Sequence, residues 1–547
     1  MKKTIPIGVV NYEQLRKENY YFVDKSMMIS DFLKRKNTAT LITRPRRFGK
    51  TINLSMMASF FDITKNSKEL FEDTQIMGTE YAVELNQYPT IFISFADAKG
   101  DLVNIVRQIK NQLQYEYNRY EFIFVNLTKL ETNKYEKIIN DLMETDNGKI
   151  EASIDALTFL MTQLEVYYDK KVMVLIDEYD TPFIEAHVGG FYNEIKNGLS
   201  NMLHNALKTS TSLQYAMLTG IQRVAKENIF SDLNNLVVCT VKDKEYSNYF
   251  GFTEEETKAV LEYYDLELNK EVKEMYNGYK FGDCEIYNPW SILNYAIKKS
   301  LEPYWVNTSG NKMIRNAMEK SNQSFKQDYE KLIQTGRLET FVKMDTSFYE
   351  VNNTESLWGL LVNAGYLTIT ETISVRDRYY VLKIPNEEVQ DEFKNLTAYY
   401  LNLEAIDLYQ LFNNLKYERI EDFEKKYQEI LLTIPSYYDL KDENSYHMMV
   451  LGMCAWLKEE YEISSNQEVG KGRCDIILKS KHEQYPSYVL EFKYTKDSNV
   501  NLDKLADIAL KQIEERNYDI KLKGKVVRIG LAHYQKEVAI KWKEKQR

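Results

Sequence analysis

The sequence predicts an α/β protein with three parts: a parallel sheet with flanking helices, a helical middle region, and a smaller α/β domain at the C-terminus. Three observations predict this order. Strand-like and helix-like segments alternate in the first half, charged helical stretches dominate the middle, and the residues after 440 follow the order helix, three strands, helix, strand. At 547 residues the chain is too long for one core. We expect domains at residues 1–250, 251–440 and 441–547.

Strand–helix alternation in the first domain indicates a parallel sheet covered by helices on both faces. The most apolar segment, VMVLI, is an unbroken aliphatic run of the kind found in strands buried on both sides. The candidate strands are Thr38–Thr43, Thr90–Phe95, Val172–Ile176 and Leu213–Thr219, and the segments with helical spacing between them include Leu102–Tyr115 and Ile154–Tyr168.

The segment Ile42–Asn53, ITRPRRFGKTIN, joins the first candidate strand to a segment that can form a helix. A Gly-Lys-Thr at such a junction is the core of a P-loop, the phosphate-binding loop of nucleoside triphosphatases. Lys50 is expected to reach the terminal phosphates, and the Thr51 hydroxyl to ligate Mg²⁺. Arg44 stands where the full pattern has a glycine, so the match is incomplete.

Backbone N–H groups in this loop and at the start of the helix attract phosphate oxygens. Arg47, Phe48 and Gly49, which precede Lys50, are therefore expected to bind the nucleotide as well. The alternative is that Gly-Lys-Thr forms an ordinary turn.

Acidic residues follow the third candidate strand at once, where open α/β sheets bind ligands. In a nucleoside triphosphatase the first of them, Asp177, would help to hold Mg²⁺. Glu178 is then placed to act as the general base that polarises the attacking water. A solvated loop is the alternative for this segment, but its position after a P-loop favours the phosphate site.

Two further residues follow the fourth candidate strand. Thr219 would lie next to the acids if that strand neighbours Val172–Ile176, where its hydroxyl could sense the γ-phosphate or orient water. Arg223 could supply positive charge to the transition state. The alternatives are a strand-ending turn for Thr219 and a surface position for Arg223.

The middle region has a different character. Charged helical stretches such as Thr253–Tyr264 and Glu271–Met275 are interrupted by the turn-like Tyr276–Gly282. We interpret residues 251–440 as a helical lid and connector.

The last domain contains a second group of candidate functional residues. Its expected elements are a buried helix Tyr446–Lys458, a strand Tyr461–Glu468, a tight turn Gly470–Arg473, strands Cys474–Leu478 and Tyr488–Lys493, an amphipathic helix Leu502–Glu515 and a final strand Lys525–Leu531.

Within these elements, alternation along a strand places Glu491 and Lys493 on one face and Phe492 on the other. Asp475 on the adjacent strand can point to the same place. Two converging carboxylates bind Mg²⁺ through oxygen ligands, and a neighbouring lysine can position a water and stabilise phosphate charge. These are the parts needed for metal-assisted hydrolysis of a phosphodiester.

Composition excludes several classes of protein. The net charge of −10 argues against a surface coated for nucleic-acid binding, but residues 501–547 carry 12 Lys/Arg against 7 Asp/Glu, a local charge of +5. A solvated helix face is the alternative for that excess. Met448–Leu457 is the longest strongly apolar stretch, too short to span a membrane, and the N-terminus is not that of a signal peptide. Four scattered cysteines indicate a reduced, cytoplasmic protein without a zinc site.

The chain as a whole resembles the AAA-ATPase-like family of bacterial proteins that carry a C-terminal PD-(D/E)XK nuclease-superfamily domain. In this family the Arg-Pro-Arg-Arg-Phe form of the P-loop is typical. The motifs that carry the resemblance are IPIGVVNYEQLRKENYYFVDKS, RPRRFGKT, LIDEYDTPF, TGIQRV, FSDLNNL, YNGYKFG, YNPWS, SNQEVGKGRCDI and LEFKY.

The resemblance implies ATP binding by Lys50 and Thr51, with Asp177 and Glu178 at the magnesium and the water. Asp475, Glu491 and Lys493 match the nuclease motif, and Glu468 and Gln512 fall at auxiliary positions. The leading hypothesis is an ATP-dependent switch coupled to a Mg²⁺-dependent nuclease that acts on nucleic acid, DNA before RNA. The alternative is a signalling or binding module whose C-terminal domain recognises nucleic acid or protein without cleaving it. An oligomer is compatible with either.

Overall fold

The computed structural model describes residues 2–223, 235–305, 323–344, 353–390, 392–393, 403–433, 443–457 and 460–545. The chain divides into two compact units. Unit 1 comprises Met1–Ala317 and Glu339–Val389, and unit 2 comprises Met318–Leu338 and Gln390–Arg547. The division into three domains at residues 250 and 440 stays a prediction.

Unit 1 is built on a five-stranded sheet with the strand order β2-β3-β4-β1-β5, and every neighbouring pair is parallel. All four strands predicted from the sequence are present, and β3 is buried along its whole length, as its aliphatic run requires. The short edge strand β5 was not predicted. The strands are β1 (Ala39–Thr43), β2 (Thr90–Ser94), β3 (Val172–Asp177), β4 (Leu213–Gly220) and β5 (Leu236–Cys239).

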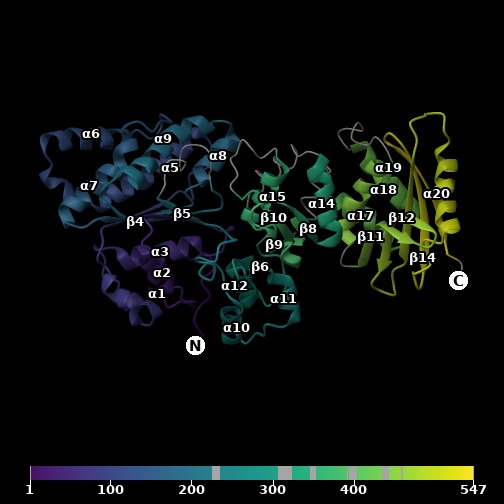
Figure 1. Cartoon of the computed structure of the whole chain (residues 1–547), viewed down its shortest axis with the longest axis horizontal. Coiled ribbons are helices and arrows are strands. Elements are labelled where there is room, and N and C mark those ends of the chain that lie inside the picture. Colours follow the sequence, from purple (N-terminus) through teal and green to yellow (C-terminus); the bar gives the residue numbers. More distant parts are fainter. Residues whose placement is uncertain are drawn as a thin grey trace. The chain divides into compact units, whose positions relative to one another are not determined.

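Helices cover both faces of this sheet, with α1 to α3 on one side and α5 to α9 on the other (Figure 1). The predicted helices Leu102–Tyr115 and Ile154–Tyr168 correspond to α5 and α7. The helices are α1 (Tyr12–Lys17), α2 (Met27–Arg35), α3 (Lys50–Phe61), α4 (Lys68–Phe71), α5 (Leu102–Arg119), α6 (Lys129–Met143), α7 (Ala156–Tyr168), α8 (Thr181–Gly189) and α9 (Tyr192–His204).

The remainder of unit 1 is mixed rather than purely helical. The two predicted helices are confirmed as α10 and α11, whereas the turn-like segment Tyr276–Gly282 contains strand β6, which pairs with β7. A three-stranded sheet has the order β8-β10-β9. The elements are α10 (Glu254–Tyr263), α11 (Lys270–Tyr276), β6 (Tyr279–Phe281), β7 (Cys284–Ile286), α12 (Pro289–Lys298), β8 (Arg337–Phe341), α15 (Thr354–Ala364), β9 (Thr368–Ser374) and β10 (Tyr379–Lys383).

Unit 2 contains a second five-stranded sheet, of order β11-β12-β13-β14-β15, in which only β13 and β14 are parallel. The predicted order of helix, three strands, helix and strand is confirmed, but β14 is not the final strand because β15 follows it. The elements are α14 (Gln323–Thr335), α17 (Ala405–Lys416), α18 (Ile420–Thr433), α19 (Glu443–Met453), β11 (Tyr461–Val469), β12 (Gly472–Ser480), β13 (Ser487–Tyr494), α20 (Leu502–Arg516), β14 (Val526–Tyr534) and β15 (Glu537–Glu544).

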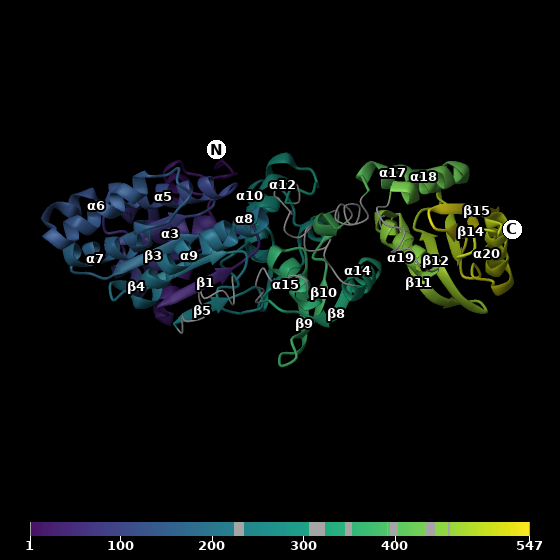
Figure 2. The same cartoon turned by 90° about the horizontal axis from the view of Figure 1, so that it is seen from above.

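Helices lie on opposite faces of this second sheet. The crossover helix α20 packs on one face, and α19 lies on the other (Figures 1 and 2). An apolar core forms between the sheet and α17, α18 and α19, and it includes Phe492 of β13. Phe492 therefore faces away from α20, as strand alternation predicted.

Candidate functional sites

The segment between β1 and α3 has the path of a phosphate-binding loop, and Arg44 does not obstruct it. The Arg44 guanidinium is fully buried and donates to the carbonyl oxygens of Thr43 (2.8 Å) and Cys239 (3.1 Å). It also lies over the Phe250 and Phe281 rings. Burial lowers its pKa to about 10. The residue that replaces the expected glycine thus ties β1 to the end of β5.

Lys50 and Thr51 open helix α3 and contact the predicted acids directly. The Lys50 ammonium donates to the carbonyl oxygens of Arg44 (3.2 Å) and Pro45 (3.1 Å) and lies 3.3 Å from a Glu178 carboxylate oxygen. The Thr51 hydroxyl donates to Asp177 over 2.8 Å. Two motifs that lie about 126 residues apart therefore form one site.

The Asp177 carboxylate is the centre of this site. It is fully buried at the end of β3 and accepts hydrogen bonds from Thr51, from Thr219 on β4 (2.7 Å) and from Ser94 on β2 (3.3 Å). Burial, and after it the nearby Glu178 charge, raises the Asp177 pKa. Thr219 lies next to the acids because β4 neighbours β3. Sequence reasoning missed Ser94, whose only signal was its place at the end of a candidate strand.

Tyr179 and Asp180, which follow Glu178, form hydrogen bonds to the backbone just after the end of β4. Asp180 accepts from the backbone N–H groups of Ile221 (2.9 Å) and Gln222 (2.8 Å), while the Tyr179 hydroxyl donates to the Gln222 carbonyl (2.6 Å). Burial, and then the Glu178 charge, raises the Asp180 pKa to about 7. Arg223 follows this clamped segment and is half-buried. Its role stays a prediction, and the motif FSDLNNL falls largely on residues 224–234, outside the described residues.

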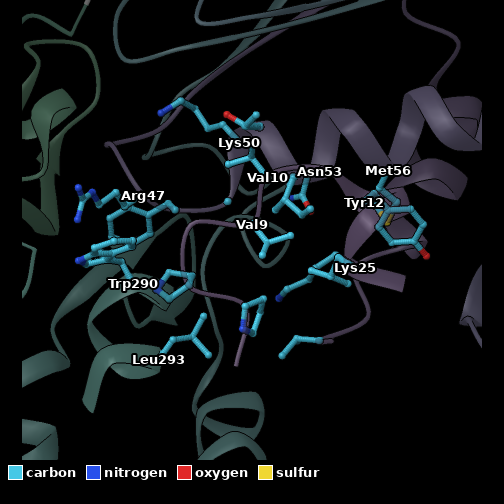
Figure 3. Close-up of a pocket in the computed structure, with 18 of the residues that line it drawn as sticks. Val9, Val10, Tyr12, Lys25, Arg47, Lys50, Asn53, Met56, Trp290 and Leu293 are labelled. Carbon is cyan, nitrogen blue, oxygen red and sulfur yellow. The ribbon is translucent and has the colours of Figure 1, made fainter. Parts of the chain in front are cut away.

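The tip of the loop is anchored to the following part of unit 1. Arg47 has a left-handed backbone, and its guanidinium lies 3.8 Å from the centre of the Trp290 ring on α12 (Figure 3). The Phe48 ring is buried against Tyr279 and Phe281 of the β6–β7 hairpin. The loop is therefore in direct contact with α12 and the β6–β7 hairpin.

In unit 2 the carboxylates of Asp475 and Glu491 take the place of ladder hydrogen bonds between β12 and β13. Regular pairing of these strands reaches Ile476 and Leu490 and goes no further. Beyond it, the Asp475 carboxylate accepts from the Phe492 N–H (2.8 Å), and a Glu491 oxygen accepts from the Asp475 N–H (3.4 Å). Both side chains are thus fixed at the point where the strands separate.

Lys493 and Gln512 complete this constellation. The Lys493 ammonium lies 3.7 Å from Glu491 and 3.4 Å from Glu443, and it donates to the Phe492 carbonyl (2.9 Å). Gln512, on α20, donates to Glu491. The other auxiliary candidate, Glu468, is exposed on β11 in register with Arg473, and within the described residues it forms no hydrogen bond or ion pair with this set.

Two residues near these carboxylates were missed from the sequence. Glu443 begins α19 just before the predicted helix start, and it contacts Lys493. His447, one turn later, is buried with its Nε2 2.9 Å from the Ser465 hydroxyl and 3.1 Å from the Asp475 carbonyl. Neither belongs to a motif, so only the position of a single acid or histidine on a helix could have indicated them.

The electrostatics of this set suit a divalent cation. Burial, followed by the Asp475 charge, raises the Glu491 pKa to about 8, and burial also raises the pKa of Asp475 and of Glu443. Among the described residues no group of three or more His, Cys, Asp or Glu is arranged to hold a metal. Mg²⁺ needs only one or two carboxylates when water and substrate oxygens supply the other ligands. Asp475 and Glu491 fit that requirement.

Comparison with known proteins relates both ends of the chain to known families. Residues 6–230 match the family model described as predicted AAA-ATPase, and residues 441–543 match that of the PD-(D/E)XK nuclease superfamily. The chain therefore carries an AAA-ATPase-like domain in residues 6–230 and a PD-(D/E)XK nuclease-superfamily domain in residues 441–543. It is also 28% identical over 397 residues to an uncharacterized protein in the vnfD 5' region of Azotobacter chroococcum mcd 1, covering 71% of this chain and 69% of that protein.

In the part of the chain that the structure describes, no helix combines the length and the apolarity that a membrane span requires.

Proposed function

We propose that this protein hydrolyses ATP in unit 1 and uses a Mg²⁺-dependent nuclease site in unit 2 to cleave nucleic acid, DNA in preference to RNA. The observation that carries the proposal is the convergence of Asp475, Glu491 and Lys493 at the point where β12 and β13 separate. All four cysteines are free, which suits the reducing cytoplasm where we place the protein.

In unit 1, the residues around Asp177 would hold and activate a triphosphate. Lys50 would exchange its loop carbonyls for phosphate oxygens, while the backbone of Arg47, Phe48 and Gly49 donates to the same group. Thr51 and Asp177 would hold Mg²⁺, which supplies charge neutralisation at the phosphates.

Glu178, once released from Lys50, would accept a proton from the attacking water. Thr219 would fix the orientation of the Asp177 carboxylate, because its hydroxyl donates directly to it. Arg223 would place positive charge near the γ-phosphate.

In unit 2, Asp475 and Glu491 would hold Mg²⁺, which polarises the phosphodiester. Lys493 would orient the water whose oxygen attacks phosphorus. As that P–O bond forms, the opposite P–O bond breaks and the leaving oxygen takes up a proton. Gln512, through its contact with Glu491, and His447, through the Asp475 carbonyl, would keep the two carboxylates in position.

The test is cleavage of labelled single- and double-stranded DNA and RNA by the full chain in Mg²⁺ or Mn²⁺, with and without ATP. Asp475→Asn should abolish cleavage, whereas Glu483→Gln, which changes an exposed acid in the turn between β12 and β13, should not. Lys50→Ala should abolish ATP binding measured by calorimetry. Cleavage that persists in Asp475→Asn would remove the nuclease assignment, and equal ATP affinity in Lys50→Ala would remove the nucleotide assignment.

The alternative is a signalling or binding module that hydrolyses ATP but cleaves nothing. The net charge of −10 favours it, and so does the finding that, in the described part of the chain, no group of three or more His, Cys, Asp or Glu is arranged to hold a metal. ATP turnover that requires Lys50, together with no cleavage by the wild type, would select this alternative and direct the search to a protein or nucleic-acid partner that is bound without being cut.

A further inference from the structure

Two features of the C-terminal sequence have no part in the metal chemistry: the turn Gly470–Arg473 and the excess positive charge of residues 501–547. The structure brings them together. A cavity of about 630 Å³ lies between this turn and one face of helix α20 in unit 2. Its lining includes Gly472 and Arg473 from the turn and Ile508, Lys511, Gln512 and Arg516 from the helix.

Backbone contacts fix the turn against the end of α20. The Lys471 N–H donates to the Arg516 carbonyl (2.8 Å), and the Arg516 guanidinium donates to the Lys471 carbonyl (3.0 Å). Gly470 has a φ of +62°, and a Cβ at this position would clash with the Arg516 carbonyl oxygen. The two walls of the cavity are therefore tied to each other, so the site is built before any ligand binds.

Lys511 is a cation that is available to a ligand. Lys511 is exposed, and within the described residues its ammonium forms no hydrogen bond or ion pair. Three basic residues and one acidic residue, Glu515, line the cavity, so its charge favours an anion. Other basic residues of the C-terminal segment form ion pairs with acidic side chains, namely Arg528, Lys541, Lys543 and Lys545.

The cavity adjoins the carboxylates of unit 2 through Gln512. This side chain lies in the cavity wall and donates both to Glu491 and to the Tyr518 hydroxyl (3.4 Å). A nucleic-acid strand held at Glu491 by one phosphate must place its next phosphate a single nucleotide away. The volume lies within the range of about 300–1,000 Å³ typical of small-molecule sites, and Ile508, which is 54% exposed, offers apolar surface to a sugar or base. The cavity therefore suits one nucleotide of the strand in position, size and charge.

We infer that this cavity binds the nucleotide next to the scissile phosphate, with the Lys511 ammonium against the phosphate group of that nucleotide. Lysine binds phosphate as a point charge and does not read the base, so the contact positions the strand without selecting a sequence. The inference rests on the proposed function, because it assumes that Asp475 and Glu491 bind the metal at the scissile phosphate. Efficient cleavage then requires a substrate with a second phosphate.

Two substrates of the full chain in Mn²⁺ separate this cavity from the carboxylates: a labelled DNA oligonucleotide, and bis(p-nitrophenyl) phosphate, a diester with a single phosphate. Lys511→Ala should raise the KM for DNA by about tenfold and leave hydrolysis of the small diester unchanged. Lys511→Arg, which keeps the charge, should retain most of the DNA affinity. The matched control is Lys504→Ala, which removes an exposed lysine on the same helix outside the cavity, and it should change neither activity.

A second variant and a binding measurement extend this test. Ile508→Glu adds an acid to the cavity at an exposed position and should raise the KM for DNA in the same way. In the Asp475→Asn background, Lys511→Ala should reduce the slope of log DNA affinity against log salt concentration by roughly 0.7–0.9, the value for one phosphate contact.

An unchanged KM for DNA in both Lys511→Ala and Ile508→Glu would overturn the inference and leave the nuclease site intact. An equal loss of activity on both substrates would also overturn it, because the effect would then arise at the carboxylates. Hydrolysis of neither substrate by the wild type would overturn the proposed function, and the inference with it.

Discussion

Lys50 and Glu178 form an ion pair at the phosphate loop, so a bound nucleotide would compete with Glu178 for the lysine. Both side chains are largely buried. Phosphate oxygens are the stronger partners for an ammonium in a loop of this kind. When phosphate oxygens replace Glu178 as the partner of Lys50, the Glu178 carboxylate is released.

Glu178→Gln should separate binding from hydrolysis. Removal of the negative partner leaves Lys50 available to phosphate, so ATP affinity should be kept or increased. Loss of the general base should lower ATP turnover by roughly 10²–10⁴-fold. Steady-state turnover and calorimetry on the same preparation measure both, with Glu194→Gln, an exposed acid on α9, as the control. Undiminished turnover in Glu178→Gln would exclude this residue as the base.

Glu388 should make unit 1 less stable as the pH rises. Its buried carboxylate accepts from the Trp305 N–H (2.7 Å) and the Ser291 hydroxyl (2.9 Å), yet burial raises its pKa from 4.5 to about 7. Between these values the native state keeps a proton that the unfolded chain has lost, so stability is full below pH 4.5 and falls up to pH 7, by roughly 1–3 kcal/mol.

Glu388→Gln should flatten that dependence, because an amide oxygen still accepts from both donors but no longer titrates. Thermal unfolding at pH 6 and pH 8.5 would show it as a smaller difference in Tm between the two pH values than in the wild type. An unchanged difference would assign the pH dependence to other groups.

How far the sequence predicts individual site residues depends on whether they belong to a motif. Lys50, Asp177 and Glu491 stand at fixed distances from other members of their motifs, and the structure places each beside the partners expected from that spacing. Ser94 and His447 enter their sites through tertiary contacts alone. The spacing of residues along the chain does not indicate tertiary contacts, so Ser94 and His447 were missed.

At the scale of elements, burial decided what could be predicted. Strand β3 is buried along its whole length, and its uninterrupted aliphatic run therefore identifies it in the sequence. Strands β5 and β15 lie at sheet edges and are partly exposed, so their sequences, LVVC and EVAIKWKE, are too short or too polar to stand out. The hairpin β6–β7 was missed for a related reason, since its three-residue strands sit among glycines that are typical of turns.

Helix α20 packs against β14 so closely that one side chain would separate them. A Cβ on Gly530 would lie 2.3 Å from the Ala506 carbonyl oxygen and 2.6 Å from the Leu510 backbone nitrogen. Gly530→Ala must therefore displace α20, and with it the Gln512 contact to Glu491. We expect a loss of stability of about 1–3 kcal/mol from overpacking.

The same substitution should lower nuclease activity while ATP affinity stays unchanged, because Gly530 and the ATP site belong to different units. Gly524→Ala is the control: no atom lies within 4 Å of its added Cβ, although its positive φ adds local strain. Calorimetry and the cleavage assay on both variants make the comparison. Full activity in Gly530→Ala would show that the position of α20 does not matter to the carboxylates.

At the scale of the whole molecule, each unit has its own apolar core and its own buried acids. The core around β1 to β4 lies in unit 1, and the core shared by β11 to β15 with α17 to α19 lies in unit 2. The length of the chain could predict that more than one core exists, but not how the activities influence each other. That influence is the free energy by which ATP binding and DNA binding change each other, and it must be measured with both ligands.

If ATP gates the nuclease, coupling must be reciprocal. ATP should change DNA affinity, and DNA should change ATP affinity, by the same factor, typically about 5- to 150-fold. Asp475→Asn allows both measurements because it should bind DNA without cutting it. In the same background Lys50→Ala should abolish the effect of ATP on DNA binding and leave DNA affinity without ATP unchanged. Identical DNA affinities with and without ATP would mean that the two sites work independently, and the ATPase would then serve some step other than control of cleavage.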